Sequence, residues 1–367
     1  MKILLVSTSR SDINFLSQIF KTLQQTSIPV YLLLTGQHSF SGIDSNTPFL
    51  SQFSSAERGN IITSDILGNT NYSYSNDASS TADETFLTIK KLKPTCVILS
   101  GDRYEMLVAA TVCSQLTDLK LIHYAAGQTS TGSQDEIYRE CISRLCQYYI
   151  FSNSTNHLKL ASTLPIEDSQ FCITGSLGLD RLYQSLPVAP VVPGKVLLIM
   201  HPQAYHNNEL IDFTVHTLLL TRQELGSSFH LFISRVNNDL VSDSFYSRLV
   251  SKIRDAQIQY NELLSIPDSE YIYHLGSSCV LLGNSSSLVV EAPSLTKSTI
   301  LLGDRQAGRE SARSVLKANL SVSRFNRLLR VCLSLNDRPS SPAYFVNPYY
   351  LGGGSTILQR FLRRIHD

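Results

Sequence analysis

Short apolar runs alternate with amphipathic segments from the start of the chain. Met1 to Thr8 contains the unbroken run Ile3–Val6, which predicts a buried β-strand. The segment Ile13–Gln25 predicts an amphipathic helix with Asp12 as its N-cap, and Pro29–Thr35 predicts a second strand. This order of strand, helix and strand favours parallel strands joined by a right-handed crossover.

The same alternation continues through the first half of the chain. The polar stretch from Gly36 to about Ala78 is too long for an idle connection, and we expect it to hold a short helix and a strand beside the binding cleft. After it, the pattern predicts helices at Ser80–Leu92, Glu105–Gln115 and Asp135–Cys146, and strands at Thr95–Leu99, Leu119–Tyr124, Tyr148–Ser152 and Phe171–Thr174.

A proline-rich segment, 185–194, separates this half from a second alternating half and has the composition of a semi-rigid linker. We therefore predict an α/β protein with two Rossmann-like, doubly wound domains facing a cleft, at residues 1–184 and 195–350. A final helix within 351–367 follows a glycine triplet and is expected to pack back across the domain junction. The predicted elements of the second half are strands at Lys195–Met200, Phe229–Ser234, Cys279–Leu282 and Thr299–Leu302, and helices at Asn208–Leu225, Asp243–Arg254, Ser286–Ala292 and Ser355–Ile365.

Composition and charge narrow the class of protein. A hydrophobic content of 43% with 17% charged residues is typical of a folded globular chain, and the net charge of +1 gives no general attraction to nucleic acid or to an acidic membrane. The N-terminal apolar run is too short for a signal sequence, and no stretch reaches the roughly 20 apolar residues of a membrane span. The seven cysteines include no CxxC pair, which argues against structural zinc. We expect a cytoplasmic protein with reduced thiols.

The first candidate for chemistry is the turn after the predicted strand Cys279–Leu282. Here Gly283 and Asn284 precede the serines at 285–287 and a segment of helical length. Backbone N–H groups at the start of a helix and serine hydroxyls can bind an anion, so a diphosphate would suit this turn. Glu291, further along, could accept hydrogen bonds from a ribose. The alternative is that Asn284 and the serines are only helix caps.

A second candidate lies at the end of the predicted strand Thr95–Leu99, which delivers Gly101, Asp102 and Arg103 to the edge where open α/β sheets bind ligands. The alternative functions are structural. Asp102 could cap the following helix, and Arg103 could pair with Glu105.

Several motifs, taken together, resemble the UDP-N-acetylglucosamine 2-epimerase family, and in particular its hydrolysing bacterial branch. The motifs are STSRSD from Ser7, TGQHSFS from Thr35, GDRYEM from Gly101, GSLGLDRL from Gly175, MHP from Met200, GNSSSLVVEAPS from Gly283, GDRQAGR from Gly303 and NPYYLGGGS from Asn347. They cover nearly the whole chain in order. The resemblance implies a fold like that of the GT-B glycosyltransferases, a homodimer, and a UDP-sugar substrate that needs no metal or other cofactor.

The resemblance also implies roles for individual residues. Removal of the proton at C2 and loss of UDP would give a 2-acetamidoglucal, to which water adds with inversion at C2. The residues implied in catalysis are Asp102, Gln128, Asp135, Glu136 and His201, and those implied in substrate or nucleotide binding are Arg10, His38, Arg103, Asn284, Ser285, Ser286, Ser287, Glu291 and Arg309.

One segment, HYAAGQTSTG from His123, departs from the family pattern H-x-H-G-G-E-x-T-E-G. Gln128 stands where the family has a glutamate thought to act in catalysis, and Ala125, Ala126 and Thr131 replace a histidine, a glycine and a second glutamate. An amide cannot accept a proton at neutral pH, although it can hydrogen-bond a sugar hydroxyl. The alternatives are therefore a nucleotide-sugar binding protein without turnover and a glycosyltransferase of the GT-B fold.

Overall fold

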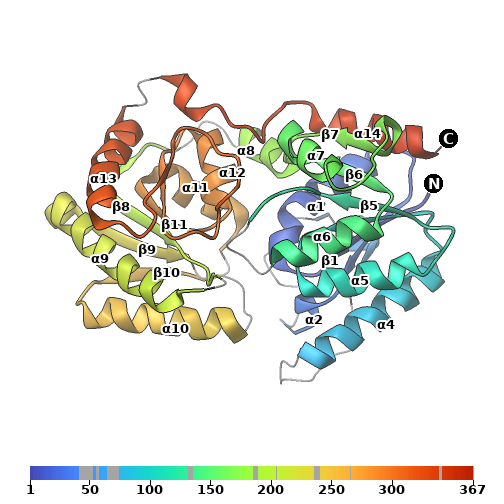
Figure 1. Cartoon of the computed structure of the whole chain (residues 1–367), viewed down its shortest axis with the longest axis horizontal. Coiled ribbons are helices and arrows are strands. Elements are labelled where there is room, and N and C mark those ends of the chain that lie inside the picture. The colour runs from blue at the N-terminus through green and yellow to red at the C-terminus, as the bar shows by residue number, and fades with distance from the viewer. Residues whose placement is uncertain are drawn as a thin grey trace. The chain divides into compact units, whose positions relative to one another are not determined.

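Two parallel β-sheets, one in each half of the chain, form the framework of the computed structural model (Figure 1). The structure describes residues 1–40, 53–54, 58–63, 74–130, 135–184, 189–203, 205–234, 240–264, 266–338 and 341–366. The chain forms two units. Unit 1 is Met1–Gln128, Asp135–Asp180 and Tyr349–Asp367, and unit 2 is Thr129–Gln134 and Arg181–Pro348.

The sheet of unit 1 has the strand order β3-β2-β1-β4-β5-β6-β7. All five residues of β1 are buried, and Ile3 pairs with Val30 on one side and with Cys96 on the other. The direction of strand addition reverses between β1 and β4, which makes this pair a topological switch point. The strands are β1 Ile3–Ser7, β2 Val30–Leu34, β3 Ile61–Thr63, β4 Cys96–Ser100, β5 Lys120–Tyr124, β6 Tyr148–Phe151 and β7 Phe171–Ile173.

Helices cover both faces of this sheet, as crossover connections between parallel strands require. The C-terminal helix α14, Gly354–His366, belongs to unit 1, where its apolar side packs into the same core cluster as β1 and α1. Arg364 in this helix donates hydrogen bonds to three backbone carbonyls, at Asp168, Ser169 and Phe171. The other helices of this half are α1 Arg10–Gln24, α2 Gln37–Phe40, α4 Tyr74–Leu92, α5 Tyr104–Ser114, α6 Asp135–Leu145, α7 Ser154–Ala161 and α8 Asp180–Gln184.

Unit 2 repeats this architecture with the strand order β10-β9-β8-β11-β12-β13, so that its switch point lies between β8 and β11. The strands are β8 Val192–Ile199, β9 His230–Ser234, β10 Tyr260–Leu263, β11 Ser278–Gly283, β12 Thr299–Leu301 and β13 Val315–Lys317. The helices are α9 Asn207–Leu225, α10 Leu240–Asp255, α11 Asp268–Ser277, α12 Ser287–Val290 and α13 Val322–Asp337.

The α/β class with two Rossmann-like halves was predicted correctly, and so were a short helix, α2, and a strand, β3, in the polar stretch after Gly36. The helix expected at Ser286–Ala292 is shorter than predicted. Helix α12 is one turn, and a 3-10 segment, Ala292–Leu295, replaces its continuation at Pro293. Strand β8 begins at Val192, inside the segment expected to be a linker. The elements α7, α11, α13, β10 and β13 were not predicted.

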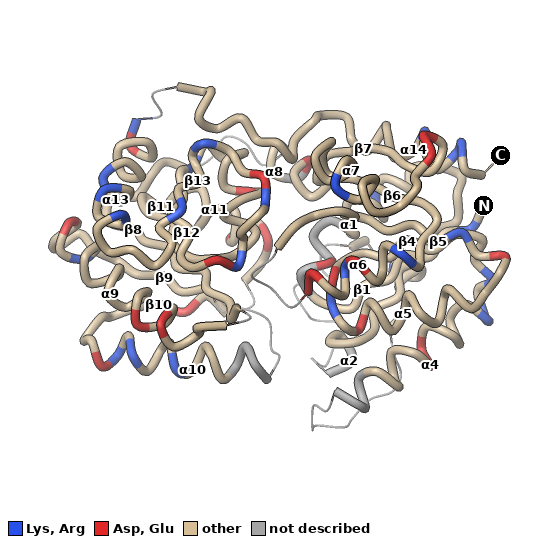
Figure 2. Tube along the Cα trace, in the orientation of Figure 1, with Lys and Arg blue, Asp and Glu red and all other residues tan. Residues whose placement is uncertain are grey.

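Acidic and basic residues alternate along the trace of both units, and α13 and α14 are rich in arginine (Figure 2). Among the residues that the structure describes, no helix combines the length and the apolar character needed to cross a membrane.

Candidate functional site

The ends of β1 and β4 in unit 1 are joined by the carboxylate of Asp12. Its Oδ2 atom accepts the backbone N–H groups of Thr8 and Ser9, each at 3.0 Å, directly after β1. Its Oδ1 atom lies against Gly101 after β4, where a Cβ would come within 2.8 Å. Gly101 also has φ of +107°, a backbone conformation that favours glycine. The sequence predicted Asp12 as a helix cap, but α1 begins at Arg10, so Asp12 lies inside the first turn.

Asp12 is only 3% exposed, and this burial raises the pKa of its carboxyl group to about 7, against the lowering effect of the hydrogen bond from Thr8. The carboxyl therefore changes charge close to neutral pH, at the point where the two strand ends meet.

The buried side chain of His123 on β5 fixes the peptide before Asp102. Its Nε2 atom lies 3.3 Å from the carbonyl oxygen of Gly101, and its Nδ1 atom lies 2.8 Å from Oγ of Ser143. Burial lowers the pKa of His123 to about 4, so the ring is neutral at pH 7. Because a carbonyl oxygen can only accept, Nε2 carries the ring proton, and Nδ1 faces the hydroxyl of Ser143, which also lies 3.0 Å from the carbonyl oxygen of Arg139.

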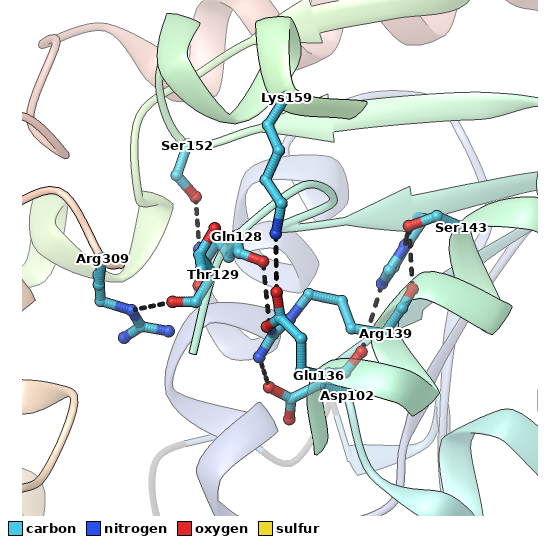
Figure 3. A network of polar contacts seen from close by, with 11 residues as sticks. Asp102, Gln128, Thr129, Glu136, Arg139, Ser143, Ser152, Lys159 and Arg309 are labelled. Atoms are coloured by element: carbon cyan, nitrogen blue, oxygen red, sulfur yellow. Dashed lines mark hydrogen bonds and ion pairs between the residues drawn. The ribbon is translucent and has the colours of Figure 1, made fainter. Parts of the chain in front are cut away.

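Asp102 is the first member of a chain of four alternating charges, shown in Figure 3. Oδ2 of Asp102 pairs with Nη2 of Arg139, and Nη1 of Arg139 lies 2.5 Å from Oε2 of Glu136. Oε1 of Glu136 lies 2.7 Å from Nζ of Lys159. We call these four residues the unit 1 charge chain. Its inner members are more buried, with Arg139 and Glu136 side chains 5% and 15% exposed, than Asp102 at 32% and Lys159 at 39%.

Burial alone would disfavour the charge of Arg139, but the carboxylates of Asp102 and Glu136 raise its pKa above the ordinary value. A buried guanidinium with two carboxylate partners is thus fixed as a cation. Asp102 is also not the cap of α5, because the N-cap residue of that helix is Arg103.

Gln128 follows a tight turn in the segment that departs from the family pattern. Its Nε2 atom donates to Oγ of Ser152 at 2.9 Å, and its backbone oxygen accepts from Nη1 of Arg139 at 3.1 Å. Within the turn Ala125 and Gly127 both have positive φ, of +63° and +68°. A glutamate at this position would present only acceptors, and Ser152 would then have to donate its hydroxyl proton in place of accepting one.

Across the switch point of unit 2, the side chain of Asn284 binds both polar backbone groups of His201. Its Oδ1 atom accepts the N–H of His201 at 2.7 Å, and its Nδ2 atom donates to the carbonyl of His201 at 2.8 Å. Gly283 before it has φ of +143°, and a Cβ there would come within 1.9 Å of the carbonyl oxygen of Ile199. Asn284 therefore links the end of β11 to the end of β8.

The serine triplet follows directly. The hydroxyl of Tyr271 on α11 donates to Oγ of Ser287 at 2.6 Å, and Ser287 Oγ lies 3.0 Å from Oγ of Ser285. Ser286 is exposed, and Ser285 is 7% exposed. Since α12 is a single turn, its dipole is weak, and the polar groups that this turn offers are backbone N–H groups and hydroxyls.

The loop after β12 wraps the same edge of unit 2. Arg305 donates to the carbonyl of Pro202 at 2.8 Å, and Gln306 donates to the carbonyl of Asn284 at 2.9 Å. Nε of Arg309 lies 3.4 Å from the carbonyl oxygen of Thr129, which belongs to the same unit (Figure 3). The ends of three adjacent strands, β8, β11 and β12, are thus tied together.

The remaining predicted residues lie as follows. His38 is buried on α2 with Nε2 2.9 Å from Oγ of Ser7, Asp135 is in the first turn of α6, and Glu291 directly follows α12. The side chain of Arg10 and the whole of Thr131 lie outside the described residues.

Sequence reasoning missed Arg139, Lys159, Ser152 and Tyr271. Only Arg139 had a local signal, because it lies three and four residues after Glu136 and Asp135 on one face of a predicted helix. No group of three or more His, Cys, Asp or Glu side chains among the described residues is arranged to hold a metal ion.

A sequence profile of the family described as UDP-N-acetylglucosamine 2-epimerase matches residues 21–362. The chain belongs to this family. It is 27% identical over 349 residues to a UDP-N,N'-diacetylbacillosamine 2-epimerase (hydrolyzing) of Legionella pneumophila, covering 91% of this chain and 89% of that protein. It is 25% identical over 328 residues to the polysialic acid biosynthesis protein P7 of Escherichia coli, covering 86% and 82% of the two chains.

Solved structures of family members share the fold. The UDP-GlcNAc 2-epimerase from Neisseria meningitidis, bound to UDP-GlcNAc, superposes with a TM-score of 0.79 at 19% identity over 99% of this chain and 100% of that chain. The enzyme from Methanocaldococcus jannaschii, in complex with UDP-GlcNAc and UDP, gives a TM-score of 0.78 at 17% identity and covers 99% of both chains. The GT-B-like, Rossmann-type architecture expected from the sequence is thus confirmed.

Proposed function

We propose that this chain is a hydrolysing nucleotide-sugar 2-epimerase that converts UDP-N-acetylglucosamine, or a related UDP- or GDP-linked amino sugar, into the free 2-epimer and a nucleoside diphosphate. Membership of the family supports the reaction class. The observation that carries the proposal is the pairing of Asp102 with the buried Arg139 at the switch point of unit 1, because the reaction needs a carboxylate held in one orientation.

We assign the nucleoside diphosphate to the switch point of unit 2. Ser285, Ser286 and Ser287 offer hydroxyl and N–H donors, and His201 is held beside them by Asn284. Donors of this kind stabilise the negative charge that develops on a departing diphosphate. Glu291 is assigned to the ribose, and Arg10 and Arg309 to the phosphates.

We assign the proton transfers to unit 1. In the first step a carboxylate, for which we propose Asp102, takes the proton from C2 while the bond between C1 and the diphosphate oxygen breaks. The electron pair of the C2–H bond forms the C1=C2 double bond of a glycal, and the nucleoside diphosphate leaves with the C1–O electrons. In the second step the C1=C2 electron pair takes a proton at C2 from the opposite face, with Asp135 the candidate for this acid, while the oxygen of water bonds to C1 and one proton of that water passes to solvent. Glu136 contacts both Arg139 and Lys159, which suits a holding role.

The experiment is incubation of the protein with a panel of UDP- and GDP-linked amino sugars in D₂O, followed by proton NMR of the products. We expect a free sugar inverted at C2 and carrying deuterium there. Asp102→Asn should lower kcat roughly 100-fold or more with little change in the dissociation constant for the nucleoside diphosphate. Ser285→Ala with Ser286→Ala should weaken nucleotide binding instead. Release of no free sugar from any member of the panel would refute the proposal.

A second candidate function, nucleotide-sugar binding without turnover, is favoured by one observation, the amide of Gln128 with its bond to Ser152. A binding protein would be stabilised by the nucleotide sugar but release nothing, and Gln128→Glu would be the variant expected to gain turnover. A glycosyltransferase would release nucleotide only when an acceptor is added. An enzyme that uses Gln128 as a donor would lose activity on Gln128→Glu, so this single variant separates the two assignments.

We further propose that the chain works as a homodimer in the cytoplasm. Light scattering coupled to size-exclusion chromatography gives the mass directly, and a mass of one chain, 40.8 kDa, would contradict the dimer.

A further inference from the structure

We propose that Lys159, on α7, is a positioning residue that acts through Glu136 to hold Arg139 on Asp102. The inference rests on the proposed function, because it matters only if Asp102 carries out proton transfer. It concerns a residue that pairs with Glu136, and it assigns a role to α7, a helix that the sequence did not predict.

Helix α7 is built to present Lys159 in a defined place. The side chain of Asn153 caps its N-terminus by accepting the N–H of Asn156 at 2.9 Å, and Leu160 is buried at 6% exposure. Lys159 lies between these fixed points, and its Nζ atom reaches Oε1 of Glu136 at 2.7 Å (Figure 3). The cation therefore has a fixed location beside α6.

The role follows from the order of charges in the unit 1 charge chain. Glu136 uses Oε2 for Arg139 and Oε1 for Lys159, while Arg139 divides its two terminal nitrogens between Glu136 and Asp102. The unit 1 charge chain contains two carboxylates and two cations, so its net charge is zero. Without the cation at position 159, Glu136 would attract Arg139 more strongly, and Asp102 would face one more uncompensated negative charge. Both effects disfavour the ionised form of Asp102.

Other charged groups surround Asp102 and must be kept constant in a test. Asp12 comes from α1, Arg103 from the start of α5, His123 from β5, and Asp135 from α6. All four side chains are present in every Lys159 variant, and Lys159→Arg, which keeps the charge, controls for their contributions.

Three variants separate this role from a merely structural one. Lys159→Met removes the charge and keeps the length of the side chain, and Lys159→Arg restores a cation. The matched control is Lys252→Met, which breaks an exposed pair with Asp212 at 3.0 Å in unit 2.

The first measurement does not depend on turnover. The carboxyl carbon of Asp102 is followed by ¹³C NMR in aspartate-labelled protein as pH is varied, with the signal assigned from Asp102→Asn. We expect the midpoint to rise by about 0.5 to 1 pH unit in Lys159→Met, to return in Lys159→Arg and to stay constant in Lys252→Met.

The second measurement is the pH dependence of kcat. On the acidic side of the profile the ionised fraction of Asp102 should fall by about three- to tenfold in Lys159→Met, for a midpoint shift of about 0.5 to 1 unit, and kcat should fall with it. KM should stay unchanged, because Lys159 is not one of the residues proposed to bind the nucleotide.

The outcomes are distinct. A Lys159→Met protein that melts at lower temperature but titrates at Asp102 like the wild type would overturn the inference and leave Lys159 as a tie between two helices. A shifted Asp102 titration supports the inference even if the wild-type protein releases no sugar, a result that would count against the proposed function alone. Sugar release by the wild-type protein, together with an unshifted Asp102 titration in Lys159→Met, would support the proposed function and overturn the inference.

Discussion

The bridge between Asn284 and His201 is the feature of unit 2 whose loss can be predicted most directly. Asn284 is 1% exposed, and its amide satisfies two polar backbone groups of His201 at 2.7 and 2.8 Å. In Asn284→Ala both bonds disappear from a site that has little access to water. His201 should also lose its fixed position at the end of β8.

The cost can be estimated from these contacts. Removing one partner of a buried hydrogen bond costs about 1 to 3 kcal/mol, so the loss of two bonds should destabilise the protein by about 2 to 6 kcal/mol. With a urea dependence of about 2 kcal/mol/M, the unfolding midpoint should fall by about 1 to 3 M.

Because the chain has no tryptophan, far-UV circular dichroism is the suitable probe of unfolding, and titration with UDP reports the state of the site. Asn261→Ala, at an exposed position of β10, is the matched control. Asn284→Asp should be as damaging at neutral pH, and partly recovered in acid, where a protonated carboxyl can again donate to the carbonyl of His201. An Asn284→Ala midpoint no lower than that of Asn261→Ala would refute the reasoning.

Two further predictions concern unit 1. The pKa of Asp12 is raised from 3.8 to about 7 in the folded protein, so the stability it contributes is full below pH 4 and is lost as pH rises through 7. The free energy of unfolding in urea should therefore fall by up to about 4 kcal/mol between pH 4 and 7, and Asp12→Asn should make this fall smaller. Gly127→Ala should lower the melting temperature far more than Gly353→Ala. Both glycines have φ of +68°, but only at Gly127 would a Cβ meet a backbone atom, the carbonyl oxygen of Asn156 at 2.2 Å. Equal decreases in melting temperature for the two variants would contradict this prediction.

The strands of this fold could be predicted where they are buried on both faces. All five residues of β4 are buried, and an unbroken apolar run is the pattern expected of a central parallel strand. The edge strand β10, with sequence YNEL, has no such run and was missed. Helix α13 did carry a helical signal, since Phe325, Leu329 and Cys332 lie on one buried side. Helix α12 was overestimated because Pro293 ends its hydrogen-bond pattern.

For the candidate site, too, the sequence predicts features that depend on neighbouring residues but not contacts between distant ones. Strand ends such as Gly101 and Gly283 were predicted from the local pattern, whereas the strand order that puts them at the two switch points comes from the structure. The ion-pair partners of the charged side chains could not be predicted from the sequence. Lys159 meets Glu136 across 23 positions of sequence, through the packing of a helix that has few apolar residues. Pairing of this kind depends on tertiary packing, which no local spacing records.

Each unit uses one side chain to join the two strand ends at its switch point, but the two side chains differ in charge. Asp12 performs this in unit 1 with a carboxylate whose pKa is raised to about 7, and Asn284 performs it in unit 2 with an amide that has no proton to lose near neutral pH. The bridge from Asn284 to the backbone of His201 should therefore keep its geometry between about pH 5 and 9, because neither the amide nor the backbone titrates there. The edge that carries Asp102 should change its charge balance within that window. It follows that the hydrogen bonds of Asn284 to His201 should depend on pH much less than the contacts of Asp12 do.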